Sequence, residues 1–445
     1  MLQRTILDSL RNWAESDYRK VLILRGARQV GKTTAVRMFS QDFDTYIELN
    51  MEIPEDKELF ENYKNVNDLY NLILLKKGKK PIGRVLLFID EIQGSSLAMA
   101  SLRFFYENMP HLYVIASGSL LELYLQRERL EIPVGRVQFL WMHPLSFDEF
   151  LLATGRKDIL QLEFPFPDYS HPVIRDIFLK YALIGGLPEA VMLWLKTNDI
   201  VLVRDNLNAI MESYRNDMIK YPRTPNQAQV LRHVMNTAYL EVGKQISFEG
   251  FGGSSYRSLS VKNALEILEL CRMFKLLYPY TSTELPSFPQ KKKRPKLLYL
   301  DIGLLNVQAQ VMADYFGSKN LNSIYKGAAM EVLVGQMLMA MEQKVGFDVA
   351  YWKRDVRSST AELDFILPWK GMLIPVEVKA GKTGTLKSLF IFMDISPLDF
   401  AVRIYDGEYK LEKLTTPNGK AFRLLNLPLA LTPWLFDYLK LEFFP

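Results

Sequence analysis

The sequence predicts an α/β protein built on a P-loop nucleotide-binding core, and three observations support that prediction. An apolar strand over residues 21–24 leads directly into a segment, 26–34, that matches the pattern G-x-x-x-x-G-K-[ST]. A helical pattern follows this segment. Further along, an unbroken apolar run over 85–89 ends in two carboxylates, Asp90 and Glu91. Such continuous runs are typical of strands buried on both faces, as in a parallel sheet.

The glycine-rich segment has the composition that a phosphate-binding loop requires. Gly26 and Gly31 let the backbone turn so that successive N–H groups point at phosphate oxygens, and the following helix adds its positive end. We expect Lys32 to lie between the β- and γ-phosphates and the Thr33 hydroxyl to take one Mg²⁺ position. The residues expected to bind the nucleoside triphosphate are Gly26, Ala27, Arg28, Gln29, Val30, Gly31, Lys32, Thr33 and Thr34.

Length and composition place the chain among ordinary soluble globular proteins. Its 445 residues suggest about three domains, and the net charge of +5 is too mild to indicate nucleic-acid binding by itself. The single cysteine, Cys271, lies in an apolar helical pattern and is expected in a core; one cysteine excludes a disulfide framework and fits a reducing compartment. No apolar run approaches the roughly 18 residues of a membrane span. These features predict a cytoplasmic protein without membrane association.

The two carboxylates after the 85–89 strand have different expected roles. They follow the C-terminal end of a strand, which is the edge where ligands bind in open α/β sheets. Asp90 is expected to hold Mg²⁺ through its water shell. Glu91, one residue on, points to the other side and can orient or deprotonate the attacking water. Other strands are expected at 20–25, 45–49, 112–116 and 137–141.

Two further polar residues of this region are candidates for the catalytic site. Ser119 closes the Ser-Gly-Ser turn after the 112–116 strand and is expected to contact the γ-phosphate or the attacking water. Arg136 precedes the 137–141 strand. It is interpreted either as an arginine finger that reaches the γ-phosphate of a neighbouring subunit or as an ordinary surface arginine.

Several of these motifs together resemble a known family. The chain is similar to prokaryotic AAA+ ATPases akin to the archaeal-type ATPases of defence and mobile elements. The resemblance covers nearly the whole chain. It implies that the nucleotide is ATP, and members typically carry a C-terminal domain of unknown function with a restriction-endonuclease-like core. The motifs that carry the resemblance are residues 25–34, the box at 89–93, the turn at 117–119, and the segments 143–147 and 185–189.

The middle of the chain predicts two smaller domains. Ser146 and Glu149 form a capping-box pattern that opens a largely helical region, 146–220, interpreted as the lid over the nucleotide, with Gly185 and Gly186 as a hinge or tight turn. Residues 221–305 predict three helices followed by a β-hairpin, which is the order of a winged helix-turn-helix.

The expected wing is strongly basic. Its loop carries Lys291, Lys292, Lys293 and Arg294, with Lys296 just after, and the helix before it carries Tyr256, Arg257 and Lys262. Such a surface suits the phosphates of double-stranded DNA. The alternative is a packing module whose lysines are simply solvated.

The C-terminal third contains a second group of charged residues. Two strand patterns, 361–367 and 372–379, are joined by a turn, so Asp364 can lie beside Glu377, and the period of two places Glu377 and Lys379 on one face. Two adjacent carboxylates in an apolar setting are costly unless a cation joins them. We therefore expect a divalent metal there, with Lys379 orienting the attacking water. The alternative is a salt-bridged hairpin in which Lys379 pairs with Glu377 or Asp364.

This second group resembles the PD-(D/E)XK nuclease core. The resemblance maps onto Asp364, Glu377 and Lys379, and it implies that Glu331, on a preceding helix, completes a site for Mg²⁺ or Mn²⁺. Leu363 stands where that family usually has proline.

The sequence therefore predicts an ATP- and Mg²⁺-dependent ATPase coupled to a DNA-binding, nuclease-like C-terminal half. The expected domains are a P-loop AAA+ core (1–145), a helical lid (146–220), a winged helix (221–305) and a PD-(D/E)XK nuclease-like domain (306–445). The rival hypothesis is an ATP-dependent switch or scaffold without nuclease activity. Assembly into a homo-oligomer stays open.

Overall fold

The computed structural model describes residues 2–61, 63–128, 132–133, 135–218, 221–222, 224–312, 327–345, 348–381 and 385–444. They form two compact units. The first comprises Met1–His143 with Leu270–Arg272, and the second Pro144–Glu269 with Met273–Pro445. The expected lid, winged helix and nuclease-like segments therefore lie in one compact unit, and the boundaries proposed between them stay predictions. Residues 313–326 of the expected nuclease-like segment are outside the described residues.

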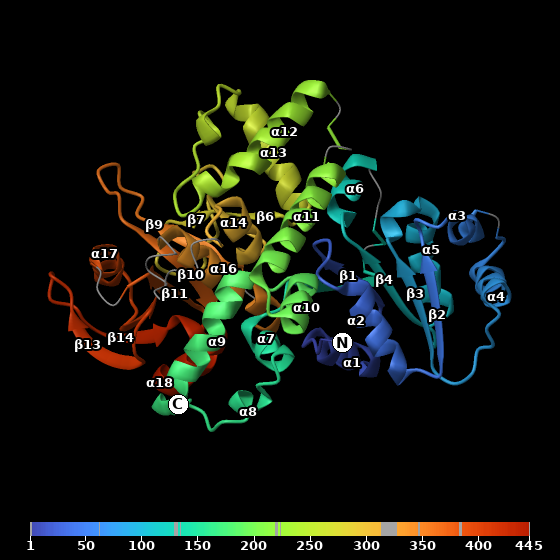
Figure 1. Cartoon of the computed structure of the whole chain (residues 1–445), viewed down its shortest axis with the longest axis horizontal. Coiled ribbons are helices and arrows are strands. Elements are labelled where there is room, and N and C mark those ends of the chain that lie inside the picture. Colours follow the sequence, from blue (N-terminus) through green and yellow to red (C-terminus); the bar gives the residue numbers. More distant parts are fainter. Residues whose placement is uncertain are drawn as a thin grey trace. The chain divides into compact units, whose positions relative to one another are not determined.

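The first unit is built on a five-stranded sheet in the order β2-β3-β4-β1-β5, in which all paired strands are parallel (Figure 1). This confirms the predicted parallel α/β core. Its strands are β1 (Val21–Gly26), β2 (Thr45–Asn50), β3 (Val85–Asp90), β4 (Tyr113–Gly118) and β5 (Val137–Met142). Its helices are α1 (Ile6–Glu15), α2 (Lys32–Phe39), α3 (Pro54–Lys57), α4 (Val66–Lys77), α5 (Ser96–Asn108) and α6 (Leu121–Glu128).

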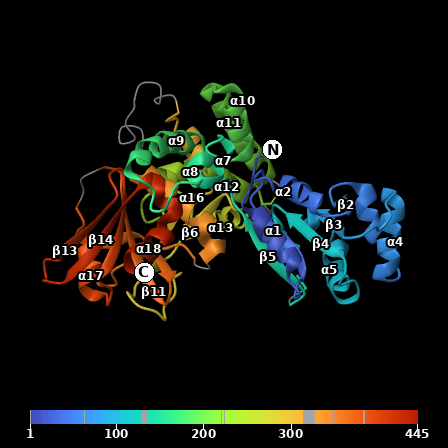
Figure 2. The ribbon, with the colours of Figure 1, turned by 90° about the horizontal axis from the view of Figure 1, so that it is seen from below.

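Helices cover both faces of this sheet. On one face, alternate residues of the strands, such as Leu87 and Ile89 of β3, join a core with Leu69 of α4 and Leu102 of α5. Helix α2 packs on β1 and β4, and α1 packs on α2; Figure 2 shows the first unit from a second direction. All six residues of β3 are buried. Continuous apolarity in the sequence thus corresponds to a strand covered on both sides.

The second unit begins with helices and continues with mixed elements. The helices are α7 (Phe147–Ala153), α8 (Lys157–Leu160), α9 (His171–Ile184), α10 (Pro188–Thr197), α11 (Ile200–Met218), α12 (Pro225–Thr237), α13 (Ser258–Leu270, whose last residue belongs to the first unit), α14 (Ile302–Gln308), α16 (Gly327–Val345), α17 (Lys387–Ile395) and α18 (Leu435–Phe443). The strands are β6 (Phe274–Leu277), β7 (Pro279–Tyr280), β8 (Lys296–Tyr299), β9 (Ala350–Lys353), β10 (Glu362–Trp369), β11 (Met372–Lys379), β12 (Phe400–Tyr405), β13 (Lys410–Thr415) and β14 (Ala421–Pro428).

Two sheets organise this unit. Strands β6 and β8 pair antiparallel, and seven strands form the order β13-β14-β12-β11-β10-β9-β7, on which α16 and α17 pack. The predicted hairpin is confirmed: β10 and β11 are antiparallel, with Phe365 opposite Val376. The expected wing differs from a simple hairpin, because β7 lies between β6 and β8 in the chain and pairs with β9 of the larger sheet.

The helical start of the second unit is tied to its interior by one carboxylate. Fully buried Asp301 accepts hydrogen bonds from the backbone N–H of Gly186 (2.6 Å) and of Gly303 (2.9 Å), and from the amide of Gln336 on α16 (3.0 Å). Burial raises the pKa of Asp301 to about 6, although these donors oppose the shift. Gly186 must be a glycine, because an added Cβ would lie 2.2 Å from the carbonyl oxygen of Leu145. The Gly185–Gly186 segment is therefore a fixed tight turn here.

Three smaller predictions concern Cys271, the start of α7 and the presence of membrane spans. Cys271 is buried, as predicted. The capping box at the start of α7 is present, with the N–H of Ser146 donating to Glu149 (3.1 Å). Within the described ranges, no one helix combines the length and apolarity of a membrane span, although the bent pair Asp168–Ile184 and Pro188–Thr197 does so jointly.

We predict that Asp301→Ala lowers the free energy of unfolding by about 2–4 kcal/mol, because three buried N–H donors lose their acceptor. Denaturant or calorimetric unfolding measures this. The matched control is Asp437→Ala, which removes an exposed carboxylate paired with Lys440 at 3.1 Å and should change stability by less than about 0.5 kcal/mol. Equal stabilities for the two variants would contradict the role given to Asp301.

Candidate active site

The phosphate-binding loop lies between β1 and α2, as predicted. Gly26 tolerates no side chain, since an added Cβ would lie 2.3 Å from the carbonyl oxygen of Met142. Gly31, with φ of 96°, precedes the first residue of α2, Lys32. Gln29 also has a positive φ, 62°, which is uncommon for a residue with a side chain. The turn thus delivers the chain to the N-terminus of α2, where backbone N–H groups can meet phosphate.

Lys32 is buried and held by the loop itself. Its Nζ donates to the carbonyl oxygens of Gly26 (3.0 Å) and Ala27 (2.8 Å). Burial lowers the pKa of Lys32 to about 8, while the charges of Glu91 and Asp90 oppose that shift. The ammonium is therefore charged at pH 7, and anionic phosphate oxygens are stronger acceptors than the two carbonyls.

Asp90 ends β3 within a set of hydrogen-bond donors. The hydroxyl of Thr33 donates to its Oδ2 (2.6 Å), the hydroxyl of Ser117 donates to its Oδ1, and the N–H of Glu91 also donates to Oδ1 (3.0 Å). Hydroxyl and carboxylate oxygens are the hard ligands that Mg²⁺ prefers. The residues fit the ion, so Thr33 and Asp90 would hold it. When bound, Mg²⁺ neutralises phosphate charge.

Glu91 has an unusual backbone and a restrained side chain. Its φ of 48° is in the left-handed region, which costs a residue with a side chain about 1 kcal/mol or more. The amide of Gln93 and the hydroxyl of Ser119, 3.2 Å from Oε2, both donate to its carboxylate. Ser119 thus contacts the expected water-positioning group directly. Strain and restraint at this residue favour a catalytic role in orienting water.

Two residues of this site were missed by the sequence analysis. Ser117 is fully buried and contacts Asp90. Its position could have been inferred by aligning the ends of the two predicted strands, because Ile89 pairs with Ala116 and the next residues are Asp90 and Ser117. Arg4 is buried and donates to the carbonyl oxygens of Val30 (2.8 Å) and His143 (2.7 Å). It fixes the loop to the chain that follows β5. No motif could indicate Arg4, because its partners are distant in sequence.

Arg136 is not brought to the nucleotide site of its own chain. It precedes β5, whose first residue Val137 pairs with Val21, so it lies at the sheet edge opposite the loop. Its Nε is 3.0 Å from Glu107 of α5, and this hydrogen bond is the main cause of the lowered pKa of Glu107. Action on a neighbouring subunit stays a prediction. Of the remaining residues predicted to bind the nucleotide, Ala27 and Val30 are buried, Arg28 is half-buried and Thr34 is exposed; their contact with nucleotide stays a prediction.

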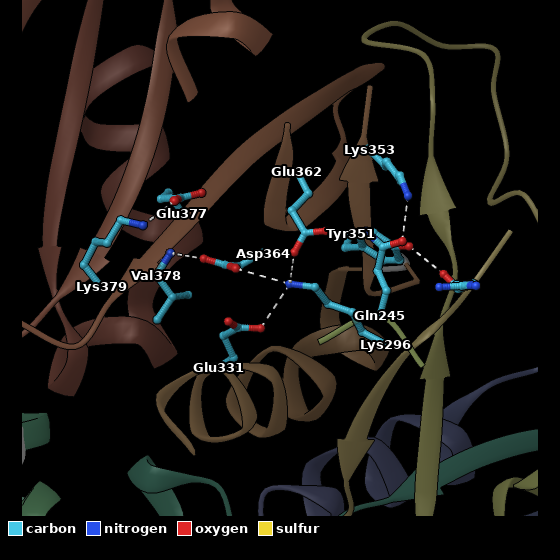
Figure 3. Close-up of polar contacts among 11 residues, drawn as sticks. Gln245, Lys296, Glu331, Tyr351, Lys353, Glu362, Asp364, Glu377, Val378 and Lys379 are labelled. Atoms are coloured by element: carbon cyan, nitrogen blue, oxygen red, sulfur yellow. Dashed lines mark hydrogen bonds and ion pairs between the residues drawn. The ribbon is translucent and has the colours of Figure 1, made fainter. Parts of the chain in front are cut away.

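The second group of charged residues also comes together (Figure 3). Glu331 of α16, Asp364 of β10 and Glu377 of β11 surround one region, in the predicted helix–strand–strand order. Lys379 pairs with Glu377 (2.5 Å), and the N–H of Val378 donates to Asp364 (2.8 Å). Burial and the charge of Asp364 raise the pKa of Glu331 and of Glu377 above the ordinary glutamate value.

The sequence indicated one cation, Lys379, beside these acids, and this expectation is incomplete. A second cation, Lys296, which follows the expected wing loop, is buried among them. Its Nζ lies 3.2 Å from Glu331, 3.3 Å from Glu362 and 3.4 Å from Asp364 (Figure 3). Burial alone would lower the pKa of Lys296, but the three carboxylates raise it above its ordinary value. Within the described residues, no group of three or more acidic, histidine or cysteine side chains is arranged to hold a metal ion.

Three family models match the chain. Residues 18–151 match the AAA domain, 175–315 match a domain of unknown function (DUF8612), and 326–425 match another domain of unknown function (DUF4143). No curated protein matches it. The second match spans most of the expected lid and the expected winged helix.

Solved structures with partial similarity include a Walker-type ATPase of Pyrococcus abyssi (16% identity, TM-score 0.42, covering 69% of this chain and 96% of that one). Another is the Aeropyrum pernix ORC1 protein in complex with DNA (13% identity, TM-score 0.30, covering 68% of this chain and 90% of that one). A third is the Thermotoga maritima RuvB Holliday junction branch migration motor (12% identity, TM-score 0.28, covering 65% of this chain and 93% of that one). These TM-scores are too low to carry an argument.

The loop, the two strand-end carboxylates and the parallel sheet define a P-loop nucleoside triphosphatase. The match over residues 18–151 specifies the type: the first unit is an AAA ATPase domain, and the protein is an ATP-hydrolysing enzyme.

Because the pKa of Lys32 is low, the affinity for ATP should depend on pH. The bound phosphates raise this pKa, so binding takes up a proton wherever free Lys32 is neutral. We predict constant ATP affinity from pH 7 to about 8 and then a rise in Kd of up to about tenfold per pH unit. Calorimetry or a fluorescent nucleotide measures it. Lys32→Arg, always charged, should bind more weakly but with a flat profile. A flat wild-type profile to pH 10 would contradict the assignment.

The roles of Lys32 and Glu91 can be separated by substitution. Lys32→Ala should raise the Kd for ATP by about 10- to 100-fold, because a charged hydrogen-bond donor is lost. Glu91→Gln should keep the Kd while lowering kcat by about 10²- to 10⁴-fold. Glu58→Gln, an exposed carboxyl in the same unit, should change neither. Normal turnover by Glu91→Gln would withdraw the water-positioning role.

Proposed function

We propose that this AAA ATPase, a member of the archaeal-type group by its motifs, uses ATP hydrolysis to control a C-terminal region that binds double-stranded DNA. The observation that supports this most directly is the basic loop between β7 and β8, where Lys291, Lys292 and Arg294 are exposed. Duplex phosphates are bound by such clusters whatever the base sequence. ATP and DNA are the proposed ligands, and a homo-oligomer in which Arg136 acts on a neighbour remains part of the proposal.

The elements around this loop support a winged-helix interpretation. Helix α12, short helical turns at Ala238–Glu241 and Phe251–Gly253, helix α13 and the β6–β8 pair follow one another in the chain. Arg257, just before α13, is exposed, and Lys262 on α13 is 3.7 Å from Glu266, a long and half-exposed pair that a phosphate can replace. Both cations are accessible enough to contact a polyanion.

The loop is also held in place before any ligand binds. The N–H of Gln290 donates to the carbonyl of Pro279 (2.8 Å), and the hydroxyl of Tyr351 donates to the carbonyl of Arg294 (2.6 Å). A restrained loop loses less conformational entropy on binding. Lys293 is paired with Asp355 (2.5 Å), so the loop offers three cations rather than the four that the sequence suggested.

The second candidate function is an ATP-dependent switch or scaffold that contacts no DNA. The Lys293–Asp355 pair and the mild net charge of +5 favour it, because both reduce the attraction of this region for a polyanion. The sequence also predicted metal-dependent cleavage. That activity would require Mg²⁺ or Mn²⁺ among Glu331, Asp364 and Glu377, and the ammonium of Lys296 beside Glu331 and Asp364 argues against it.

DNA binding by the full chain tests the proposal. Labelled duplexes of unrelated sequence are titrated at several salt concentrations, with and without ATP, and with Glu91→Gln to retain the nucleotide. We expect binding that is independent of sequence and sensitive to salt and nucleotide. Absence of binding at low salt in every nucleotide state would leave the switch or scaffold as the function.

We predict that neutralising Lys291, Lys292 and Arg294 together by alanine weakens binding equally for all duplex sequences. The slope of log K against log salt should become shallower by about 0.9 for each lost phosphate contact, or about 2.7 in all. The matched control removes three exposed lysines of the first unit, Lys76, Lys79 and Lys80, and should keep the wild-type slope. Equal slopes in the two triple variants would mean that the basic loop is merely solvated.

A further inference from the structure

The position of Lys296 is determined by strand pairing and not by a flexible side chain on the surface. It is the first residue of β8, lies opposite Leu277 of β6, and forms a bridge with Gln245 on its other side. Its side chain is 4% exposed. A backbone held from both sides leaves the ammonium few alternatives to the acids in front of it.

The surroundings of Lys296 form a connected set of polar contacts (Figure 3). Gln245 donates to Glu362 through its amide and accepts from Lys353 (2.6 Å) through its oxygen. Glu362 in turn lies 3.3 Å from Lys296. The acid on the far side of the ammonium, Glu331, comes from α16. The cation of β8 is thus enclosed by two acids of β10 in the larger sheet and by one acid of α16.

The ammonium and a divalent ion compete for the same oxygens. Mg²⁺ or Mn²⁺ binds carboxylate oxygens at about 2.0–2.2 Å. The Nζ of Lys296 lies 3.2 Å from Glu331 and 3.4 Å from Asp364, so an ion bridging these two acids would overlap it. The donor set therefore does not fit a metal while Lys296 occupies this position.

We propose that Lys296 is the resident cation of this acidic cluster, so that the wild-type nuclease-like domain excludes divalent metal and accepts it when the ammonium is removed. Buried carboxylates need a compensating charge. Lys296 supplies it for Glu331, Glu362 and Asp364, while Lys379 supplies it for Glu377.

Removal of the Lys296 ammonium would create a metal site, and the geometry identifies the ligands of that site. Glu331 and Asp364 would lose their partner. Buried Oε2 of Glu377 has no hydrogen-bond partner among the described residues, although Oε1 is bound by Lys379. Three carboxylates from α16, β10 and β11 would then lie around the position vacated by the ammonium, and their hard oxygen donors suit Mn²⁺.

The experiment compares four forms of the nucleotide-free full chain: wild type, Lys296→Met, Lys296→Arg and the double variant Lys296→Met with Asp364→Asn. Mn²⁺ binding is followed by electron paramagnetic resonance of the free ion and by the shift in Tm. We expect Lys296→Met to gain one Mn²⁺ per chain and a metal-dependent rise in Tm. We expect neither Mn²⁺ binding nor a metal-dependent rise in Tm for the wild type, for Lys296→Arg or for the double variant.

Two outcomes would overturn the proposal. One is a folded Lys296→Met variant that gains no Mn²⁺. The other is a wild-type chain that binds Mn²⁺ and loses it on Asp364→Asn alone, a comparison that does not require Lys296→Met to fold. Both readouts are independent of DNA binding, so failure here is distinguishable from failure of the DNA-binding proposal.

Discussion

Burial of β3 on both faces is the constraint on which the ATPase site depends. Six consecutive buried residues leave no place for charge until the strand ends, so the carboxylates fall at the edge where β1 also delivers the phosphate-binding loop. Asp90 then accepts hydrogen bonds from Thr33, Ser117 and the N–H of Glu91. Glu91 takes a left-handed backbone, and its carboxylate is held by Gln93 and Ser119. The chemistry of the site follows from where the sheet permits polar groups.

The sequence predicted what is local and missed what is long-range. Gly26 to Thr34 are consecutive residues that run from the end of β1 through the loop into α2, so spacing alone indicated the turn and its ligand. The β10–β11 hairpin is equally local, and Asp364 and Glu377 came together as expected. Arg4, in contrast, meets Val30 and His143 only through the folded chain. Its residue type and spacing carry no periodic signal.

Lys296 shows why counting charges along a sequence is a weak guide to where they lie. It comes soon after four basic residues, and this neighbourhood suggested that it belongs to a basic wing tip at the surface. Strand pairing separates it from them, since Pro295 and Lys296 are buried whereas Arg294 is exposed. The pair β6–β8 lies where the wing hairpin was expected, but β7, between them in the chain, joins the larger sheet, and the winged helix stays a prediction. Tertiary pairing therefore decided both the environment of Lys296 and the anchoring of the loop.

The position of Lys296 on β8 makes the number of residues in the preceding loop important. Surface loops normally tolerate insertions and deletions. Here the exposed cations end at Arg294, two residues before β8 begins, and Lys296 and Leu297 point to opposite faces of that strand. A one-residue change in the loop that shifted the register of β8 would turn Lys296 to the other face, which is also buried, and would present Leu297 to three carboxylates. Related chains that keep the acids should therefore conserve the number of residues before β8 more strictly than the identities of the basic ones.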